Sequence, residues 1–190
     1  TIHSTGTDTV NGKAAVVAVN TLGTVAGTVT DTVLNISGDK KLVASPEATW
    51  TTITSTNTAG VDLTIASGTA LTVTGGAGDD RIEIDALSDI TALDTIKGGE
   101  GTDTLALSQV IGTDFSAVQL AAISGFEKLE YITASQTAAA RTIDLTKLTG
   151  INHLVLDGTL ANDSSGSKST TIKGADGLTV DIEGIDGANS

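Results

Sequence analysis

Short apolar runs alternate along the chain with turns rich in Gly, Asp, Asn and Ser. Each run is about 4–7 residues long and is bounded by turn residues, which is typical of β-strands. Dipeptides such as Asn11-Gly12, Asp157-Gly158 and Asp176-Gly177 favour tight corners, because these residue types tolerate a positive φ. The pattern predicts strands at residues 14–19, 32–36, 61–65, 70–74, 81–84, 103–107, 128–132, 152–156, 170–172 and 178–182.

One segment departs from this pattern. Apolar residues between 114 and 123 follow a helical spacing, with Asp114 expected as the N-cap and Gly125 as the stop. Ser45-Pro46-Glu47 could open a second helical turn, because Pro suits the first position of a helix. Residues 85–93 could form a third brief helix.

The small number of large side chains bears on the architecture. Aromatic residues make up 2% of the 190 residues, and the chain has no Met and no Cys. A globular sandwich of this size would place several rings in its core, whereas stacked coils can be filled by Val, Ile, Leu, Ala and Thr. We therefore expect an all-β fold, namely an elongated β-solenoid or β-roll-like module with one or two short helices. A Thr-rich β-sandwich is the competing architecture.

Charge and composition exclude several classes of function. The 23 acidic and 10 basic residues give a net charge of −13, which has the wrong sign for a nucleic-acid-binding protein. No apolar run approaches the roughly 18 residues of a membrane span, so we expect no membrane insertion. Disulfides and thiolate metal sites are impossible without Cys. Because the chain also lacks a G-x-S-x-G motif, we expect no active site and no enzymatic activity within it.

Two stretches match the nonapeptide G-G-x-G-x-D-x-U-x, in which U is a large apolar residue, at residues 75–83 and 98–106. Every specified position is met in both copies. The glycines let the backbone turn sharply and aim carbonyl oxygens inward, and the Asp adds a carboxylate oxygen. Ca²⁺ takes 6–8 oxygen ligands, so one such turn supplies too few and two stacked turns can complete the shell together.

The spacing of the two copies predicts how they stack. Their starts lie 23 residues apart, about five more than the regular coil of two nonapeptides, and the extra residues fit a bulged opposite edge at 85–89. We therefore expect the two turns to lie one coil apart, with Ca²⁺ between Asp80 and Asp103. Asp79 and Asp85 lie in the same acidic stretch and could add an oxygen. The alternative is an Asx-turn, in which these carboxylates cap loop N–H groups and bind no metal.

At this point the chain resembles the RTX (repeats-in-toxin) family of secreted bacterial proteins, and within it the S-layer proteins that Gram-negative bacteria export by type I secretion. The resemblance lies in Leu71-Thr72-Val73-Thr74 before the first turn, in Asp94-Thr95-Ile96-Lys97 before the second, and in Ser124-Gly125-Phe126-Glu127-Lys128-Leu129. It covers about 60 residues, from 71 to 131, and the rest of the likeness is compositional. RTX toxins and proteases carry long uninterrupted arrays, whereas this chain has two complete copies.

The resemblance implies a parallel β-roll wound around Ca²⁺ in a calcium-dependent building block of a surface layer. Carried over by position, Asp80 and Asp103 would be the side-chain ligands of the ion. The expected carbonyl ligands are those of Gly75, Ala77, Gly99 and Gly101. The expected location is extracellular, on the bacterial cell surface, and the expected partners are copies of the chain itself and a cell-surface polysaccharide.

Three regions follow one another within one continuous module. Residues 1–70 form a Thr-rich β region, 71–108 the RTX-like calcium-binding segment, and 109–190 a β-rich region with the short helix near 114–123. The predicted function is that of a calcium-stabilised structural module that assembles into a lattice. The alternatives are a segment of a type I-secreted adhesin and the RTX tail of a secreted enzyme whose catalytic domain lies outside this chain.

Overall fold

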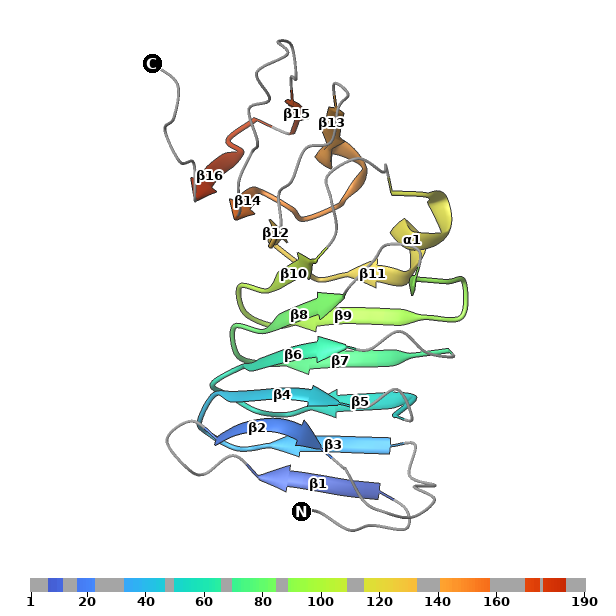
Figure 1. Cartoon of the computed structure of the whole chain (residues 1–190), viewed down its shortest axis with the longest axis vertical. Coiled ribbons are helices and arrows are strands. Elements are labelled where there is room, and N and C mark those ends of the chain that lie inside the picture. The colour runs from blue at the N-terminus through green and yellow to red at the C-terminus, as the bar shows by residue number, and fades with distance from the viewer. Residues whose placement is uncertain are drawn as a thin grey trace.

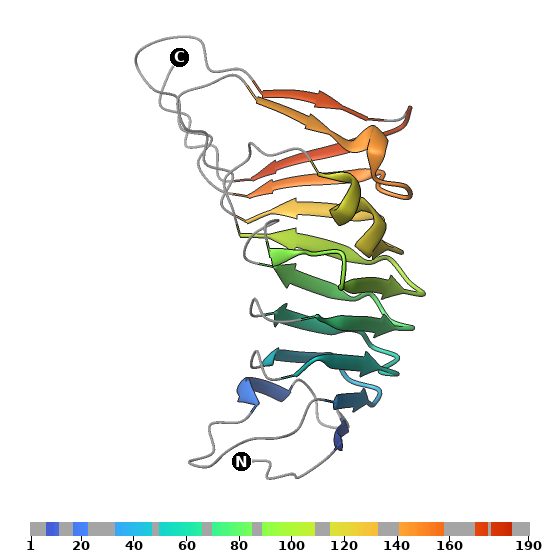
Figure 2. The same ribbon diagram turned by 90° about the vertical axis from the view of Figure 1, so that its right-hand side faces the viewer.

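The chain folds into a β-solenoid, a stack of coils whose strands build two long sheets side by side (Figures 1 and 2). The computed structural model describes residues 7–11, 17–22, 33–46, 50–65, 70–84, 89–108, 115–132, 141–157, 170–174 and 176–183. Within these ranges every pair of neighbouring strands is parallel. The all-β solenoid predicted from the sequence is therefore confirmed, and the sandwich alternative is wrong.

The chain alternates between the two sheets, adding one strand to each sheet per coil over most of its length. Sheet A contains, in spatial order, β1 (Thr7–Asn11), β3 (Val33–Ser37), β5 (Thr52–Ser55), β7 (Thr72–Gly76), β9 (Thr95–Gly99) and β11 (Ile123–Ser124). Sheet B contains β2 (Val17–Leu22), β4 (Leu42–Pro46), β6 (Val61–Ile65), β8 (Arg81–Ile84), β10 (Thr104–Leu107), β12 (Lys128–Tyr131), β14 (His153–Asp157) and β16 (Thr179–Glu183). A third, two-stranded sheet pairs β13 (Arg141–Asp144) with β15 (Thr170–Lys173).

The core consists of apolar ladders that run along the stack between the sheets. In sheet B, one ladder places its members at matching positions of successive strands, and all are fully buried: Leu63, Ile82, Leu105, Leu129 and Leu154. Burying each such side chain stabilises the fold by about 1.5–3 kcal/mol. Because each coil buries its apolar face against the next, each coil depends on its neighbours for stability. The four aromatic residues, Trp50, Phe115, Phe126 and Tyr131, are also buried.

Most strands were predicted close to their observed positions, but β1, β4, β5, β9, β11 and β13 were not predicted as strands. The segment of β5 has a single strongly apolar residue, Ile53, between threonines, and alternation is weak there. Ser45-Pro46 lies in β4, so the helical turn predicted there is wrong. Pro46 is the last residue of that strand and pairs with Leu22 of β2 beyond a register shift, an irregular position where a missing N–H is tolerated.

The predicted helix exists as α1 (Ala117–Ala122), which is shorter than expected. Its N-cap is Ser116, and the prediction of Asp114 is wrong. Ser116 and Gln119 form a capping box, in which the Gln119 N–H donates to Ser116 Oγ and the Ser116 N–H donates to Gln119 Oε1 at 2.8 Å. A one-turn 3₁₀ helix, η2 (Leu145–Lys147), was not predicted. Of residues 85–93, where a third brief helix was expected, 85–88 lie outside the described residues and 90–93 are not helical.

The three predicted regions are joined within the same sheets, because β6 pairs with β8 and β10 pairs with β12. Neither α1 nor any other helix in the described ranges combines the length and apolar character that crossing a membrane requires.

Candidate functional site

The two glycine-rich turns occupy the same corner of successive coils, as the sequence predicted. Gly76 pairs with Gly99 in sheet A, and Arg81 pairs with Thr104 in sheet B. Asp80 and Asp103 stand directly before β8 and β10, so they occupy equivalent places one coil apart.

A ladder of carboxylates runs through this corner. Asp80 Oδ1 accepts a hydrogen bond from the Val61 N–H at 2.7 Å, and Asp103 Oδ1 accepts one from the Asp80 N–H at 2.8 Å. In the next coil Glu127 Oε2 accepts from the Asp103 N–H, also at 2.8 Å. Each carboxylate thus caps the backbone N–H of the equivalent residue one coil earlier. This capping resembles the Asx-turn considered as the metal-free alternative, in which the carboxylates cap loop N–H groups. Here, however, each carboxylate caps an N–H of another coil and not of its own turn.

Capping uses only one oxygen of each aspartate. Asp80 is 1% exposed and Asp103 is 0% exposed. Within the described part of the chain, neither Asp80 Oδ2 nor Asp103 Oδ2 has a hydrogen-bond partner. A buried polar atom without a partner destabilises a fold by about 1–3 kcal/mol, and more when it is charged. At both corners, a proton or a cation bound to the unpaired Oδ2 would therefore stabilise the fold.

Asp94, which stands directly before β9 at the opposite corner, shows that capping between coils does not itself leave an oxygen unpaired. Asp94 Oδ1 accepts from the Leu71 N–H of the preceding coil at 2.6 Å. Its Oδ2 accepts from the Thr91 N–H at 2.6 Å and from Thr91 Oγ1 at 2.8 Å. Asp94 is thus satisfied on both oxygens by donors from the chain, unlike Asp80 and Asp103.

The unpaired oxygens lie over inward-facing glycines. A Cβ on Gly75 would lie 2.4 Å from Asp80 Oδ2 and 2.1 Å from the Gly98 carbonyl oxygen. A Cβ on Gly98 would lie 2.5 Å from Asp103 Oδ2 and 1.9 Å from the Gly125 carbonyl oxygen. Both corners thus bring one carboxylate oxygen and one carbonyl oxygen of the next coil to the space that a side chain would fill.

The electrostatics of the corner disfavour two bare carboxylates. Burial raises the pKa of Asp80 to about 7. The hydrogen bond from the Val61 N–H opposes this shift, and the negative charges of Asp103 and Asp79 add to it. Burial likewise raises the pKa of Asp103, with further repulsion from Glu127 and Asp79. Near pH 7 the Asp80 carboxyl group of the metal-free corner is therefore partly protonated and partly charged. A bound cation would favour the charged form.

The donor set fits calcium in chemistry, since carboxylate and carbonyl oxygens are the ligands that Ca²⁺ prefers. Among the described residues no group of three or more His, Asp or Glu side chains is placed to hold a metal ion. Backbone oxygens and water would therefore have to supply most of the shell. Asp80 and Asp103 would each hold an ion through Oδ2, Asp80 together with the Gly98 carbonyl and Asp103 together with the Gly125 carbonyl.

The other predicted ligands are placed differently. Asp79 is exposed, and its Oδ1 accepts from the Thr102 N–H of the next coil at 2.9 Å. Gly75 lies beneath Asp80 on the inner face, whereas Ala77, Gly99 and Gly101 are exposed. Asp85 lies outside the described residues.

Sequence analysis did not single out Gly98, Gly125 or Glu127 as part of the corner. The run Ser124-Gly125-Phe126-Glu127 brings an acidic residue to the place that Asp80 and Asp103 occupy in the preceding coils, without repeating the nonapeptide. Glu127 stands directly before β12, as Asp80, Asp94 and Asp103 stand directly before β8, β9 and β10, and only for Glu127 and Asp80 does this position also precede a predicted strand.

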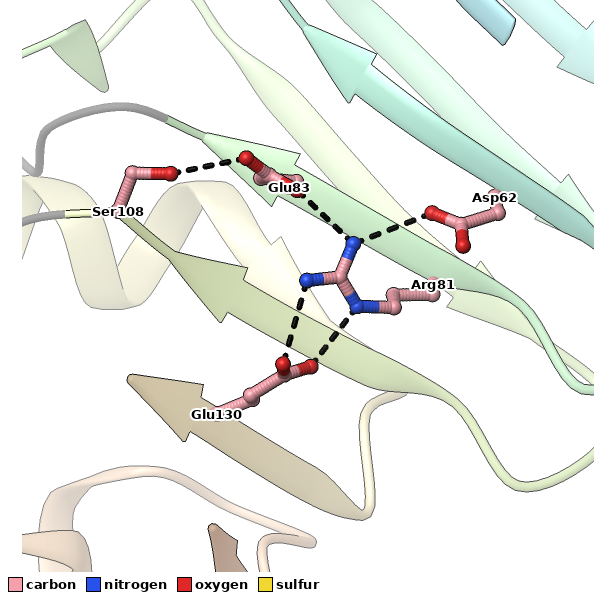
Figure 3. A network of polar contacts seen from close by, with 5 residues as sticks. All are labelled: Asp62, Arg81, Glu83, Ser108 and Glu130. Carbon is pink, nitrogen blue, oxygen red and sulfur yellow. Dashed lines mark hydrogen bonds and ion pairs between the residues drawn. The ribbon is translucent and has the colours of Figure 1, made fainter. Parts of the chain in front are cut away.

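A second cluster of charges lies on the outer face of sheet B, around Arg81 (Figure 3). The guanidinium group binds both carboxylate oxygens of Glu130, with Nε at 2.8 Å from Oε2, and Nη1 contacts Asp62 at 3.1 Å and Glu83 at 2.9 Å. Arg81 thus connects β6, β8 and β12 across the intervening β10. The Ala106 side chain of β10 is fully buried, and its small size leaves room for the crossing.

Comparisons with known proteins identify no relative. No family model matches the chain, and neither the curated proteins nor the solved structures include a match to it.

Proposed function

We propose that this chain is a calcium-stabilised structural module of a secreted bacterial surface-layer protein, which assembles with copies of itself. The observation that carries the calcium part is the pair of buried, unpartnered oxygens, Asp80 Oδ2 and Asp103 Oδ2, at equivalent corners of successive coils. The surface-layer part is supported by the resemblance of residues 71–131 to RTX S-layer proteins. An extracellular location on the bacterial surface, with a cell-surface polysaccharide as a further partner, belongs to the same proposal.

Calcium would act here by linkage. An ion that binds the folded corner and not the unfolded chain stabilises the fold in proportion to its concentration above Kd. Extracellular calcium modules bind with Kd of about 0.1–1 mM, so export from the cell would itself supply the ion. At a calcium concentration of about 100 Kd, one site contributes about 2.7 kcal/mol.

The test is a calcium titration of the purified chain, followed by circular dichroism during heating and by light scattering. The melting temperature is expected to rise by about 5–10 °C at saturating calcium. Replacing both corner aspartates, as Asp80→Asn with Asp103→Asn, should remove this rise. Asp94→Asn is the matched control: Asp94 also caps a preceding coil but has both oxygens satisfied, so the calcium response should remain.

Light scattering tests the assembly part separately. Ordered sheets or filaments that form in calcium, and grow with protein concentration, would support the structural function. A melting temperature that does not respond to calcium would contradict the ion site. A chain that stays monomeric in saturating calcium and binds glycans or cells would contradict assembly and favour the adhesin alternative.

A further inference from the structure

The last strand of sheet B leaves its apolar side chains uncovered. β16 lies at the edge of the sheet, beyond β14. Val180 pairs in register with Leu154, and Ile182 pairs with Leu156. Leu154 and Leu156 are 0% and 1% exposed, but Val180 and Ile182 are 36% and 46% exposed. The two apolar ladders of the core thus end, at this edge, in side chains that are exposed to solvent.

β16 is nevertheless hydrogen-bonded along the edge that faces β14. The Thr179 N–H donates to the Asn152 carbonyl at 2.9 Å, and His153 Nε2 lies 2.7 Å from Asp181 Oδ2 on the outer face. The exposure therefore does not come from a strand that has detached from the sheet. It arises because no further strand of sheet B covers the inward-facing positions within the described ranges. Repeat proteins stay soluble when a polar coil caps such an end, and Val180 and Ile182 are not polar.

The opposite edge of sheet B also carries apolar residues in register with the core. β2 is the edge strand there, and it pairs in register with β4, Val17 with Leu42 and Val19 with Ala44. Leu42 and Ala44 are buried, and Val17 and Val19 are their register partners in β2. Each edge thus carries two apolar residues, spaced two apart, at the positions that continue the core ladders.

We propose that the β16 edge docks against the β2 edge of a second copy of this chain, so that copies stack head to tail and continue sheet B from one molecule into the next. All neighbouring strands of the sheet are parallel, so a strand that continues it must run the same way, as β2 of a translated copy does. The contact joins two different surfaces, so it does not close on itself and propagates into a filament. This inference rests on the self-assembly part of the proposed function and names the surfaces that carry it.

The test measures the mass of the full chain by light scattering and sedimentation over a wide range of concentration, with and without calcium. The wild-type chain is expected to form species that grow with concentration. A tail variant, Val180→Asp with Ile182→Asp, should remain monomeric, because charged side chains would have to be buried in the contact. Val43→Asp is the matched control: Val43 is also apolar and 39% exposed, but it lies on the outer face of β4, which is not an edge strand, so assembly should persist.

The direction of docking is tested by a head variant, Val17→Asp with Val19→Asp, alone and mixed with the tail variant. Each variant alone should be monomeric, and an equimolar mixture should stop at the mass of two chains, because one intact head meets one intact tail. A head variant that still dimerises alone would show tail-to-tail docking and overturn the proposal. Circular dichroism verifies that each variant keeps its β-sheet signal.

The remaining outcomes separate this inference from the wider proposal. If the tail variant assembles as well as the wild type, docking at β16 is wrong although self-assembly stands. If the wild-type chain is monomeric at every concentration, Val180 and Ile182 are covered within the chain itself, and both head-to-tail docking and self-assembly are overturned. Assembly that persists without any calcium response would leave docking intact and contradict only the calcium site.

Discussion

The backbone N–H of Asp80 donates to Asp103 Oδ1 at 2.8 Å, so one aspartate corner is tied directly to the next. This bond spans 23 residues of sequence and joins the starts of β8 and β10. Asp103 is thereby held with its second oxygen buried over Gly98. An ion that binds this oxygen would also hold the first oxygen over the Asp80 N–H. Calcium at the corner is therefore expected to stabilise the stacking of coils and not merely the turn itself.

Replacing both corner aspartates by asparagine should stabilise the metal-free chain at pH 7.5. Asparagine keeps an oxygen that can accept the Val61 or Asp80 N–H, removes a buried charge, and offers an amide donor to the nearby carbonyl. The gain is expected to be about 1–3 kcal/mol in the free energy of unfolding, measured by urea denaturation in a chelator. An unchanged or lower free energy would show that the second oxygens are already satisfied as carboxylates.

Alanine at the same two positions should have the opposite effect. Asp80→Ala leaves the buried Val61 N–H without its acceptor, and Asp103→Ala does the same to the Asp80 N–H. Each change is expected to cost about 1–3 kcal/mol in the same denaturation measurement in a chelator, and more in saturating calcium, because the variant also loses the stabilisation by the ion. Equal stabilities for the alanine and asparagine variants would contradict the ladder of caps between coils.

The metal-free chain should lose stability as the pH rises from about 4 to about 7. The pKa of Asp80 is near 7 in the folded chain and returns to its ordinary value of about 4 on unfolding, so the folded state binds the extra proton in this window. Its stabilising contribution is complete below the unfolded pKa and is lost as the pH passes through the folded one. Thermal melts in a chelator across this range measure the effect.

Two comparisons check the origin of that slope. The Asp80→Asn, Asp103→Asn variant should show a flatter pH dependence, since neither corner can then titrate. Saturating calcium should reverse the loss for the wild-type chain at pH 7.5. A wild-type slope that the double variant shares would assign the effect to other carboxylates.

Alanine at Gly75 or Gly98 should destabilise the chain through crowding alone. Neither glycine has a positive φ, but the added Cβ would meet a carbonyl oxygen of the next coil at 2.1 Å and 1.9 Å, respectively. We expect a cost of about 3 kcal/mol or more. Gly177→Ala is the control: Gly177 has φ +86° but open space around it, so its cost should stay near 1 kcal/mol. Similar losses at all three sites, measured by thermal melts, would contradict the close approach of the coils.

The Arg81 network should contribute to stability independently of calcium. Arg81→Lys loses the two-bond contact with Glu130, because an ammonium group cannot match both carboxylate oxygens. We expect a loss of about 1–2 kcal/mol that is similar in calcium and in a chelator. A double-mutant cycle of Arg81→Ala with Glu130→Ala isolates the pair, and a coupling energy near zero would show that the contact does not stabilise the stack.

The fold could be predicted because two features that determine it are visible in the sequence itself. Alternation of apolar residues in short runs such as 61–65 and 81–84 marks strands, and the scarcity of rings favours a thin core filled by small side chains. β5 and β9 were not predicted because threonine or lysine occupies their outward positions and each strand has a single strongly apolar residue, Ile53 and Ile96 respectively. Their strand structure is imposed by pairing with neighbouring coils.

The corner could be predicted only in part. The nonapeptide identified Asp80 and Asp103, since its residues are contiguous in sequence. Glu127 and Asp94 take part in the same kind of cap between coils, but their partners lie 23–24 residues away, and no local motif marks such a contact. Which oxygen is capped and which is left unpaired depends on the register between coils, and composition does not encode it.

The most direct test of the central claim is a crystal structure determined in millimolar calcium, with anomalous diffraction used to identify the ion. If both corners bind calcium, the map should show a calcium peak about 2.3–2.6 Å from Asp80 Oδ2 and another at the same distance from Asp103 Oδ2. A well-ordered map without either peak, in which the two Oδ2 atoms instead lie at hydrogen-bond distance from the Gly98 and Gly125 carbonyls, would show protonated aspartates and contradict calcium binding.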